Sequence, residues 1–217
     1  MDARKRLAQQ PVGVRIFAIR LASMNGDAIR PGTIIILNGT TSAGKTGILR
    51  VLQEIMAEPY LDAGIDKFIF MLPGRYLNFP LWNDVLGHAS HAGAMGHRLF
   101  SGMHHSIAAL ARAGNNVVAD HVFVEPRWVD ECAQLLTDLP AYLVGVRCPL
   151  DVTEAREKQR GDRTLGQARK QFPLVHQHGV YDFEVDTSLY SSEQCAHRVK
   201  GFVEAAQPAR ALRQLRK

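Results

Sequence analysis

The sequence predicts an α/β domain built on a parallel five-stranded sheet that helices flank. Short apolar runs, typical of strands buried on both faces, alternate along the chain with segments of helical periodicity. A glycine-rich turn lies between the first apolar run and the first helical segment. Strands that alternate with helices usually form parallel sheets, because each helix returns the chain to the starting edge.

The predicted elements follow one another from residue 34 onwards. Four strands are expected at 34–37, 116–120, 142–146 and 183–186. The second strand in chain order lies at either 60–65 or 68–72, because both stretches suit a strand. Apolar positions at helical spacing predict helices at 47–56, 98–112, 128–136, 150–159 and 192–206.

The chain is long and apolar enough for one compact domain. It has 217 residues, of which 46% are hydrophobic, and chains of this size bury a sizeable core. Turn-forming residues punctuate residues 1–31, which we expect to form an N-terminal extension. The domain itself is expected at 32–206, followed by a basic tail at 207–217.

The net charge of +5 is carried by the two ends of the chain. Residues 1–30 hold six basic and two acidic residues, and 205–217 hold four basic residues and no acidic residue. Each end therefore carries +4, which leaves −3 for residues 31–204. A mildly acidic body does not suit the phosphate backbone of nucleic acids, so we expect no nucleic-acid partner.

The sequence carries no membrane or secretion signal that we recognise. No stretch reaches the roughly 18 uninterrupted apolar residues of a membrane-spanning helix. The basic start is not followed by an apolar run with a cleavage site. Three widely spaced cysteines, Cys132, Cys148 and Cys195, suit reduced thiols. We therefore expect a cytoplasmic protein without a membrane partner, and the sequence gives no signal for an oligomeric state.

Two histidine pairs, His104 with His105 and His176 with His178, raise the question of a metal site. Neither pair has a third ligand at a characteristic spacing. Adjacent residues on a helix also point about 100° apart and do not easily share one ion. We therefore expect no zinc site at these histidines.

The strongest chemical signal is the glycine-rich loop itself. Gly39, Gly44, Lys45 and Thr46 fit the pattern glycine, four residues, glycine, lysine, then serine or threonine. The glycines let several backbone N–H groups turn towards phosphate oxygens at the positive end of the next helix. Lys45 can reach the terminal phosphates, and the Thr46 hydroxyl can ligate Mg²⁺. The predicted site for ATP and Mg²⁺ consists of Gly39, Thr40, Thr41, Ser42, Ala43, Gly44, Lys45 and Thr46.

Two aspartates are candidates for the rest of the site. Asp120 closes the third strand, where a carboxylate can ligate Mg²⁺ or hold one of its waters. If the second strand is 60–65, Asp66 lies at its carboxyl end and is a candidate base for a substrate hydroxyl. If the second strand is 68–72, Asp66 is an ordinary loop acid. Asp62 faces the same uncertainty with less support.

An arginine-rich segment follows the fourth strand. It contains Arg156, Arg160 and Arg163, with Gly161 between the last two. That glycine suits a short lid better than a rigid helix face. Arginines that close over a triphosphate stabilise the charge in transfer and exclude water. We therefore predict a catalytic role for Arg160 and Arg163, with a solvated helix end as the alternative.

Together, these motifs resemble the chloramphenicol phosphotransferase family of P-loop kinases. The resembling segments run in order at 35–49, 64–69, 111–114, 117–123, 144–148, 160–163 and 175–187. The resemblance implies a P-loop NTPase kinase-type fold and transfer of the γ-phosphate of ATP to a hydroxyl group. It also implies that Asp66 is the catalytic base, which favours a strand at 60–65. By the same resemblance, Lys45 and Thr46 contact phosphate and Mg²⁺, and Arg160 and Arg163 belong to the lid.

The chain departs from the family in the stretch expected to line the acceptor pocket. Residues 73–104 differ, and five of their large apolar side chains form either a pocket wall or part of the core: Tyr76, Phe79, Trp82, Phe100 and Met103. His121 stands where the family tends to carry a second acid. We favour a histidine accommodated by the fold over one that contacts the acceptor.

The expected function is ATP-dependent phosphorylation of a small hydroxyl-bearing molecule, with chloramphenicol or a similar antibiotic as a candidate acceptor. One alternative is a kinase for a metabolite, a nucleotide or a nucleotide sugar. An anionic acceptor would need basic residues in 73–104, where only Arg75 and Arg98 occur. Another alternative is a nucleotide-binding switch without catalysis, which would lack the base and the lid.

Overall fold

The computed structural model describes residues 29–87, 89–160 and 165–217, with the side chain of Arg160 excepted. Pro31–Lys217 forms one compact unit. Its elements are, in chain order, β1 (Ile34–Asn38), α3 (Lys45–Ile55), β2 (Tyr60–Asp62), α4 (Ile65–Ile69), η1 (Gly74–Leu77), α5 (Trp82–Leu86), α6 (Ala94–Arg112), β3 (Asn116–His121), α7 (Pro126–Leu136), β4 (Ala141–Arg147), α8 (Leu150–Arg160), α9 (Gln167–Gln171), β5 (Phe183–Asp186), α10 (Ser192–Glu204) and α11 (Ala211–Leu215).

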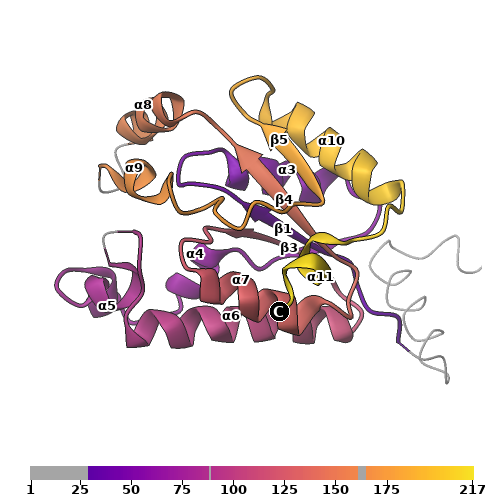
Figure 1. The fold of residues 1–217 in the computed structure, drawn as a ribbon, viewed down its shortest axis with the longest axis horizontal. Helices are drawn as coiled ribbons and strands as arrows, with labels where there is room; N and C mark the ends of the chain where they lie inside the picture. The colour runs from indigo at the N-terminus through magenta and orange to yellow at the C-terminus, as the bar shows by residue number, and fades with distance from the viewer. Residues whose placement is uncertain (1–28, 88, 161–164) are drawn as a thin grey trace, which may run out of the picture. The chain divides into compact units, whose positions relative to one another are not determined.

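The five strands form one sheet in the order β2-β3-β1-β4-β5. Every neighbouring pair is parallel, which confirms the predicted parallel α/β architecture. In the register of the central strands, Leu37 of β1 lies opposite Asp120 of β3 and Val144 of β4. The carboxyl ends of these strands therefore meet at one edge of the sheet, beside the glycine-rich loop (Figure 1).

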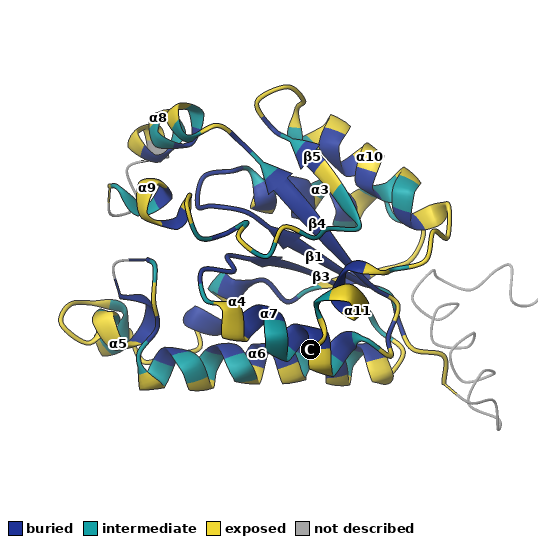
Figure 2. Ribbon diagram, in the orientation of Figure 1, coloured by how far each residue is buried: buried dark blue, intermediate teal, exposed yellow. Residues whose placement is uncertain are grey.

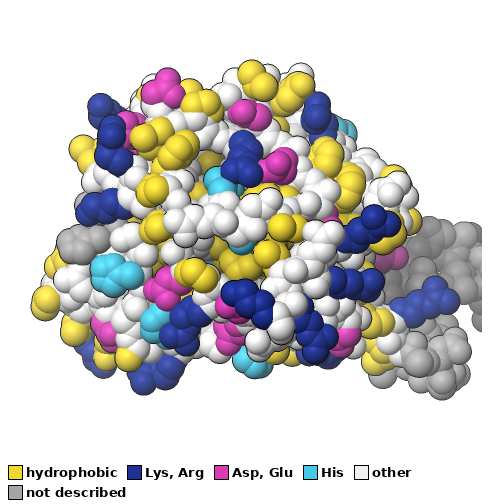
Figure 3. Space-filling model, in the orientation of Figure 1, with side chains coloured by type: hydrophobic (Ala, Val, Ile, Leu, Met, Phe, Trp, Pro, Cys, Tyr) yellow, Lys and Arg dark blue, Asp and Glu magenta, His cyan; other side chains and the backbone are white. Residues whose placement is uncertain are grey.

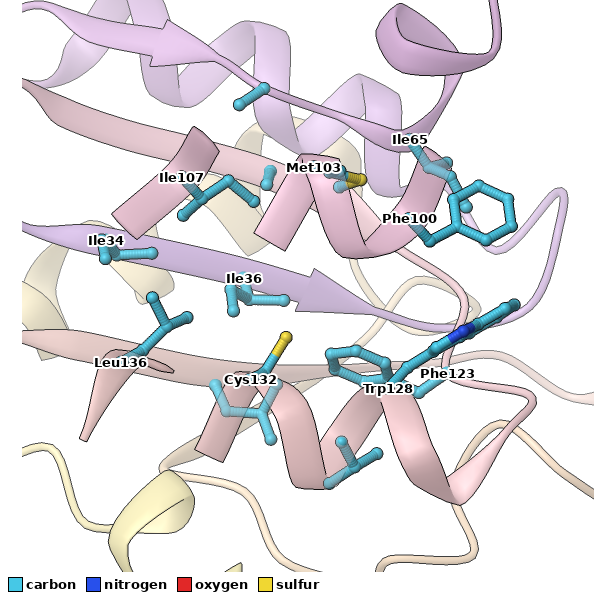
Figure 4. Close-up of a cluster of buried hydrophobic side chains, with 14 of the residues drawn as sticks. Ile34, Ile36, Ile65, Phe100, Met103, Ile107, Phe123, Trp128, Cys132 and Leu136 are labelled. Carbon is cyan, nitrogen blue, oxygen red and sulfur yellow. The ribbon is translucent and has the colours of Figure 1, made fainter. Parts of the chain in front are cut away.

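Alternate side chains of β1 point to opposite faces of the sheet and enter two separate cores. Ile34 and Ile36 pack with α6 and α7 on one face, whereas Ile35 and Leu37 pack with α3 and α10 on the other. All four are essentially inaccessible to solvent, and the strands form the buried centre of the unit (Figure 2). Figure 4 shows the first core, in which β1 isoleucines lie between the side chains of Phe100, Met103 and Ile107 from α6 and those of Trp128, Cys132 and Leu136 from α7.

The structure settles the position of the second strand. β2 occupies Tyr60–Asp62, within the earlier of the two predicted stretches. The later stretch, 68–72, instead holds the end of α4 and a turn. Its apolar character does not reflect burial in a sheet, because Phe70 and Met71 are 71% and 68% exposed.

Several short elements were not predicted. They are α4, η1, α5 and α9, each at most five residues long and too short for a clear helical period. The helix at Ser192–Glu204 was predicted to be the last one, but a further helix, α11, follows it. Ala211 and Leu212 of α11 are buried beside α7, so part of the predicted basic tail 207–217 packs on the core.

Neither the helices in the part of the chain that the structure describes nor the charge on the face shown in Figure 3 indicates a membrane-spanning segment or a strongly charged patch. None of the helices in the described ranges is long and apolar enough to cross a membrane. On the face shown in Figure 3, Lys and Arg side chains are interspersed with Asp and Glu side chains and do not gather into one patch.

Candidate functional site

The glycine-rich loop connects β1 to α3 and takes the shape that its glycines permit. Gly44 has a φ angle of 90° and directly precedes α3, in a left-handed conformation that disfavours side chains. A Cβ atom on Gly39 would lie 2.5 Å from the carbonyl oxygen of Val146 in β4. Both glycines are therefore required by the backbone path, one by its torsion and the other by close approach to the neighbouring strand.

Lys45 is the first residue of α3, and its ammonium group folds back over the loop. Its Nζ atom donates hydrogen bonds to the carbonyl oxygens of Gly39 at 2.8 Å and Thr40 at 2.6 Å. Only 6% of the residue is exposed. The loop therefore holds a buried cation beside its own backbone, where the N–H groups at the start of α3 add further positive potential.

Thr46 and Asp120 form a direct pair at the carboxyl edge of the sheet. The Thr46 hydroxyl donates a 3.0 Å hydrogen bond to Oδ2 of Asp120 near the end of β3. A hydroxyl and a carboxylate oxygen at this separation are suitable ligands for one Mg²⁺ ion. Burial raises the pKa of Asp120, with Lys45 and the Thr46 hydrogen bond acting in the opposite direction. The two residues predicted for the metal thus lie together.

Asp66 lies in the first turn of α4, a few residues beyond β2. It lines the same cavity as Lys45, Thr46 and Asp120, and its charge contributes to the raised pKa of Asp120. The weaker candidate, Asp62, is engaged elsewhere. It accepts a 3.0 Å hydrogen bond from the N–H group of Gly64 and pairs with Lys67 at 3.4 Å.

A cavity of about 520 Å³ opens beside the loop and joins these charged groups to an apolar wall. Its polar side holds Lys45, Thr46, Asp66 and Asp120, together with the amides Asn78, Gln167 and Gln171. The wall is formed by Ile65, Ile69, Phe70, Leu77, Phe79, Trp82, Leu86 and Val122. Of the five apolar residues predicted for a wall or the core, Phe79 and Trp82 line the cavity, and Phe100 and Met103 are buried in the core. The fifth, Tyr76, is half-buried and is not in the lining.

A second cavity of about 480 Å³ lies against a different part of the loop. Ser42 and Gly44 border both cavities. The rest of the second lining comes from α8 and from the segment after β5, and includes Arg156, Thr187 and Tyr190. Arg156 is fixed there, because its guanidinium donates to the hydroxyl of Thr187 at 3.0 Å and to its carbonyl at 2.7 Å.

The predicted lid is described only in part. Helix α8 continues through Arg160, one residue beyond the predicted end, and Arg156 belongs to this helix. The side chain of Arg160 and all of Arg163 lie outside the described residues. Their assignment to the phosphates therefore stays a prediction.

A family model described as chloramphenicol phosphotransferase-like protein matches residues 32–204. The chain belongs to this family. The matched region contains the glycine-rich loop, both site aspartates and every strand of the sheet. The chain is therefore a member of a P-loop phosphotransferase family, which confirms the resemblance drawn from its motifs.

Comparison with individual proteins agrees with this membership. Two relatives, from the CDC 1551 and H37Rv strains of Mycobacterium tuberculosis, carry the provisional name O-phosphotransferase. Each is 29% identical over 220 residues, which cover 95% of this chain and 97% of the relative.

Solved structures with the same fold include three kinases. A sugar kinase from Janibacter sp. has a TM-score of 0.62 at 15% identity, over 84% of this chain and 98% of its own. The adenylyl-sulfate (APS) kinase of Mycobacterium tuberculosis gives 0.57 at 16%, over 80% and 98%. The shikimate kinase of Acinetobacter baumannii gives 0.57 at 14%, over 83% and 97%. These likenesses confirm the P-loop kinase fold of this family member.

The structure adds a site residue that sequence reasoning missed. Gln171, at the end of α9, is 2% exposed, and its Oε1 atom accepts a 2.7 Å hydrogen bond from the Thr41 N–H group. The two residues are 130 positions apart. A lone glutamine outside any recognised motif carries no sequence signal, so only the fold reveals its contact with the loop.

Three polar side chains of this phosphotransferase family member form a hydrogen-bonded chain, in which the two histidines are buried and Glu131 is partly exposed. The N–H group of Val122 donates to Nδ1 of His121 at 2.8 Å, so the proton of neutral His121 lies on Nε2. That proton is donated to Nε2 of His104 at 2.9 Å, and His104 in turn donates from Nδ1 to Glu131 at 2.6 Å. Burial lowers the pKa of His121, which keeps it neutral.

This arrangement agrees with a histidine accommodated by the fold. The cavity lining does not include His121 among its described residues. Within the described ranges there is also no group of three or more His, Cys, Asp or Glu side chains suited to a metal ion.

Proposed function

We propose that this protein transfers the terminal phosphate of ATP to a hydroxyl group of a small, uncharged and largely apolar molecule. The observation that carries the proposal is the composition of the first cavity. The cavity has a volume of about 520 Å³. One side of it carries a buried lysine, a threonine–aspartate pair and a second aspartate, and the other side is an apolar wall. Pockets of this size hold drug-sized ligands.

In this proposal the phosphates of ATP bind the loop from Gly39 to Thr46, and Lys45 exchanges its backbone carbonyl partners for phosphate oxygens. The second cavity suits the nucleoside, because it borders the loop at Ser42 and Gly44 and carries Arg156 and Tyr190 on its walls. When bound to Thr46 and Asp120, Mg²⁺ would neutralise charge on the phosphates. Arg160 and Arg163 are proposed to add positive charge as a lid.

Asp66 is the proposed base of the reaction. An acceptor that rests on Phe79 and Trp82 would face the polar side of the cavity, which contains Asp66 and Lys45. A carboxylate there accepts the proton of the attacking hydroxyl group. The hydroxyl oxygen then attacks the terminal phosphate, and the bond from that phosphate to ADP breaks.

The charge of the cavity supports an uncharged acceptor. Among the described lining residues, Lys45 is the one cation, and it belongs to the phosphate loop. An acceptor with a phosphate or carboxylate group would lack a second cation and would face two aspartates. This disfavours nucleotide and sugar-nucleotide acceptors. An aromatic antibiotic of the chloramphenicol type, whose phosphorylation would give resistance, has the required chemistry. The three buried unpaired cysteines are compatible with the reducing cytoplasm in which we expect this reaction.

Replacement of Asp66 by Asn tests the proposal. We expect phosphoryl transfer to fall about 10²- to 10⁴-fold, the usual contribution of a general base. ATP binding should remain nearly intact, because the loop is unchanged. The matched control is Asp62→Asn, which makes the same chemical change in the same segment but outside the cavity lining. Acceptors come from a screen of hydroxyl-bearing antibiotics and metabolites, with the new phosphate located by mass spectrometry.

Equal turnover of the Asp66→Asn variant and the wild type would disprove the base assignment. A wild-type protein that binds ATP but phosphorylates no compound of a broad library would instead favour a nucleotide-binding switch. The apolar wall beside Asp66 argues against a switch, because a protein that binds only the nucleotide has no use for a second, apolar half of the cavity.

A further inference from the structure

Gln171 holds an unusual position beside the phosphate loop. Its carboxamide oxygen accepts the hydrogen bond from the Thr41 N–H group, while the residue is almost completely buried. No hydrogen bond joins its Nε2 group to another described residue, and this group is not among the fully buried unpaired atoms, so it keeps access to the cavity that Gln171 lines. An amide N–H donor that is held in place at a cavity and has no protein partner is available to a ligand in that cavity.

Another buried side chain holds the start of the short helix that carries Gln171. Glu157 of α8 is 2% exposed and accepts hydrogen bonds from the N–H groups of Gly166 at 2.7 Å and Ala168 at 3.0 Å. These are among the first N–H groups of α9, which a helix cannot pair internally. Glu157 therefore anchors the start of the short helix whose last residue is Gln171, and the amide is held in a defined place.

The cavity that Gln171 lines indicates which group accepts a hydrogen bond from its Nε2 atom. Gln171 borders the first cavity, together with Lys45, Asp66 and the Thr46–Asp120 pair, and it is not part of the second cavity. If the nucleoside occupies the second cavity, the terminal phosphate is the part of ATP that enters the first. A phosphate oxygen is the kind of acceptor that the Nε2 group lacks.

We propose that Gln171 is a further residue of the phosphoryl-transfer site, whose carboxamide nitrogen donates a hydrogen bond to the terminal phosphate. Its oxygen keeps the bond to Thr41, so that one side chain joins the loop backbone to the group in transfer. The inference rests on the proposed function, since it assumes that ATP binds with its terminal phosphate in the first cavity. A neutral donor held in place adds to the charge of Lys45 without a second buried cation.

The variant Gln171→Glu separates the two bonds of this side chain. The carboxylate retains an oxygen for the Thr41 N–H group but replaces the NH₂ donor by an oxygen that repels phosphate. Gln171→Met has nearly the same length and loses both bonds without introducing a charge. The control is Gln134→Glu, the same substitution at an exposed position of α7.

The main measurement is the ratio of affinities for a non-hydrolysable ATP analogue and for ADP, determined by calorimetry with Mg²⁺. A hydrogen bond to a charged group is worth about 10- to 100-fold in affinity. We therefore expect Gln171→Glu and Gln171→Met to bind the ATP analogue at least 10-fold more weakly, with ADP affinity nearly unchanged. Where an acceptor is available, kcat should fall about 10²-fold, as for the loss of one preorganised donor.

The alternative is a purely structural Gln171 that only supports the loop. In that case Gln171→Glu would behave as the wild type, and Gln171→Met would weaken both nucleotides equally. Either result overturns the inference while leaving the proposed function intact. If Gln171→Glu does not fold, the neutral Gln171→Met variant decides by its affinity ratio alone. A wild-type protein that binds neither nucleotide would overturn the inference and the proposed function together.

Discussion

The buried carboxylate of Asp120 should lower the stability of the protein without ligand, while it serves the binding of metal and nucleotide. It is 8% exposed, and burial together with repulsion from Asp66 outweighs the attraction of Lys45 and the hydrogen bond from Thr46. The net result is a pKa raised above the usual 3.8. The folded chain therefore holds this carboxyl as an ion only at a cost, which a neutral side chain of the same shape would avoid.

Asp120→Asn should consequently stabilise the protein without nucleotide and metal. The Asn carbonyl oxygen can still accept the hydrogen bond from Thr46, so the main loss is the attraction of Lys45. Relief of a disfavoured functional group typically contributes about 0.5–2 kcal/mol. For a domain of this size, about 1 kcal/mol corresponds to a Tm increase of about 2–4 °C.

The stability gained by Asp120→Asn should depend on pH in a defined direction. Because the raised pKa means that the folded state binds the Asp120 proton more tightly than the unfolded state, Asp120 favours folding at low pH. That contribution is lost as the pH rises through the raised pKa. The stability difference between Asp120→Asn and the wild type should therefore be largest near pH 7 and shrink as the pH falls towards 3.8.

Calorimetric melting with EDTA, and again with Mg²⁺ and a non-hydrolysable ATP analogue, checks both halves of the prediction. The wild type should gain about 2.7 kcal/mol at a ligand concentration 100 times Kd, whereas Asp120→Asn should gain much less. The order of the two Tm values then reverses when ligand is added. The control Asp138→Asn alters an exposed pair with Arg112 and should change little. A lower Tm for Asp120→Asn in EDTA would refute this reasoning.

Two further predictions concern the core and the acceptor wall. The hydrogen bond from His104 lowers the pKa of Glu131 from 4.5 to about 2, so the wild type should be about 1–2 kcal/mol more stable than Glu131→Gln above pH 4.5, with solvent screening allowed for. This difference should shrink as the pH falls towards 2, and a constant difference in urea unfolding across pH would contradict it. Phe79→Ala should raise the acceptor KM about 10-fold through lost apolar contact and leave the ATP KM unchanged. Leu81→Ala, which changes an exposed neighbour outside the cavity lining, is the control, and equal KM values for the two variants would count against the wall.

The regular part of the fold was predictable because periodicity reports burial. β1, β3 and β4 are short runs whose side chains are mostly buried in a core, β5 buries Val185, and the long helix α6 has an apolar stripe. The predicted ends agree with the structure to within a few residues. The stretch 68–72 gave a wrong strand prediction because Phe68 and Ile69 are buried as part of a short helix, and Ile69 and Phe70 line a cavity. An apolar side chain at a binding site and one in a core strand look alike in the sequence.

Some residues of the candidate site were predictable from the sequence, and others were not. Lys45, Thr46 and the glycines follow from a local motif, since neighbouring residues of one loop create the chemistry. Asp120 and Asp66 required the inference that parallel strands end at a common edge. Gln171 and Glu157 were not predictable, because their partners are set by tertiary packing across short helices. Each is a buried polar side chain with a backbone partner, which no composition or spacing reveals.

Charge balance links the described cavity to the predicted lid. ATP brings about four negative charges, while the described lining of the first cavity offers one lysine against two aspartates. Helix N–H groups and the proposed Gln171 hydrogen bond would offset part of this difference but add no full charge. In the proposed function, the rest would come from Mg²⁺ on the Thr46–Asp120 pair and from further cations. Arg160 and Arg163 are suitably placed in the sequence, because Glu157 and Gln171 anchor the chain on either side of residues 160–163. If the proposed function holds, we therefore expect the two aspartates that disfavour an anionic acceptor also to make nucleotide binding depend on Mg²⁺ and on these arginines.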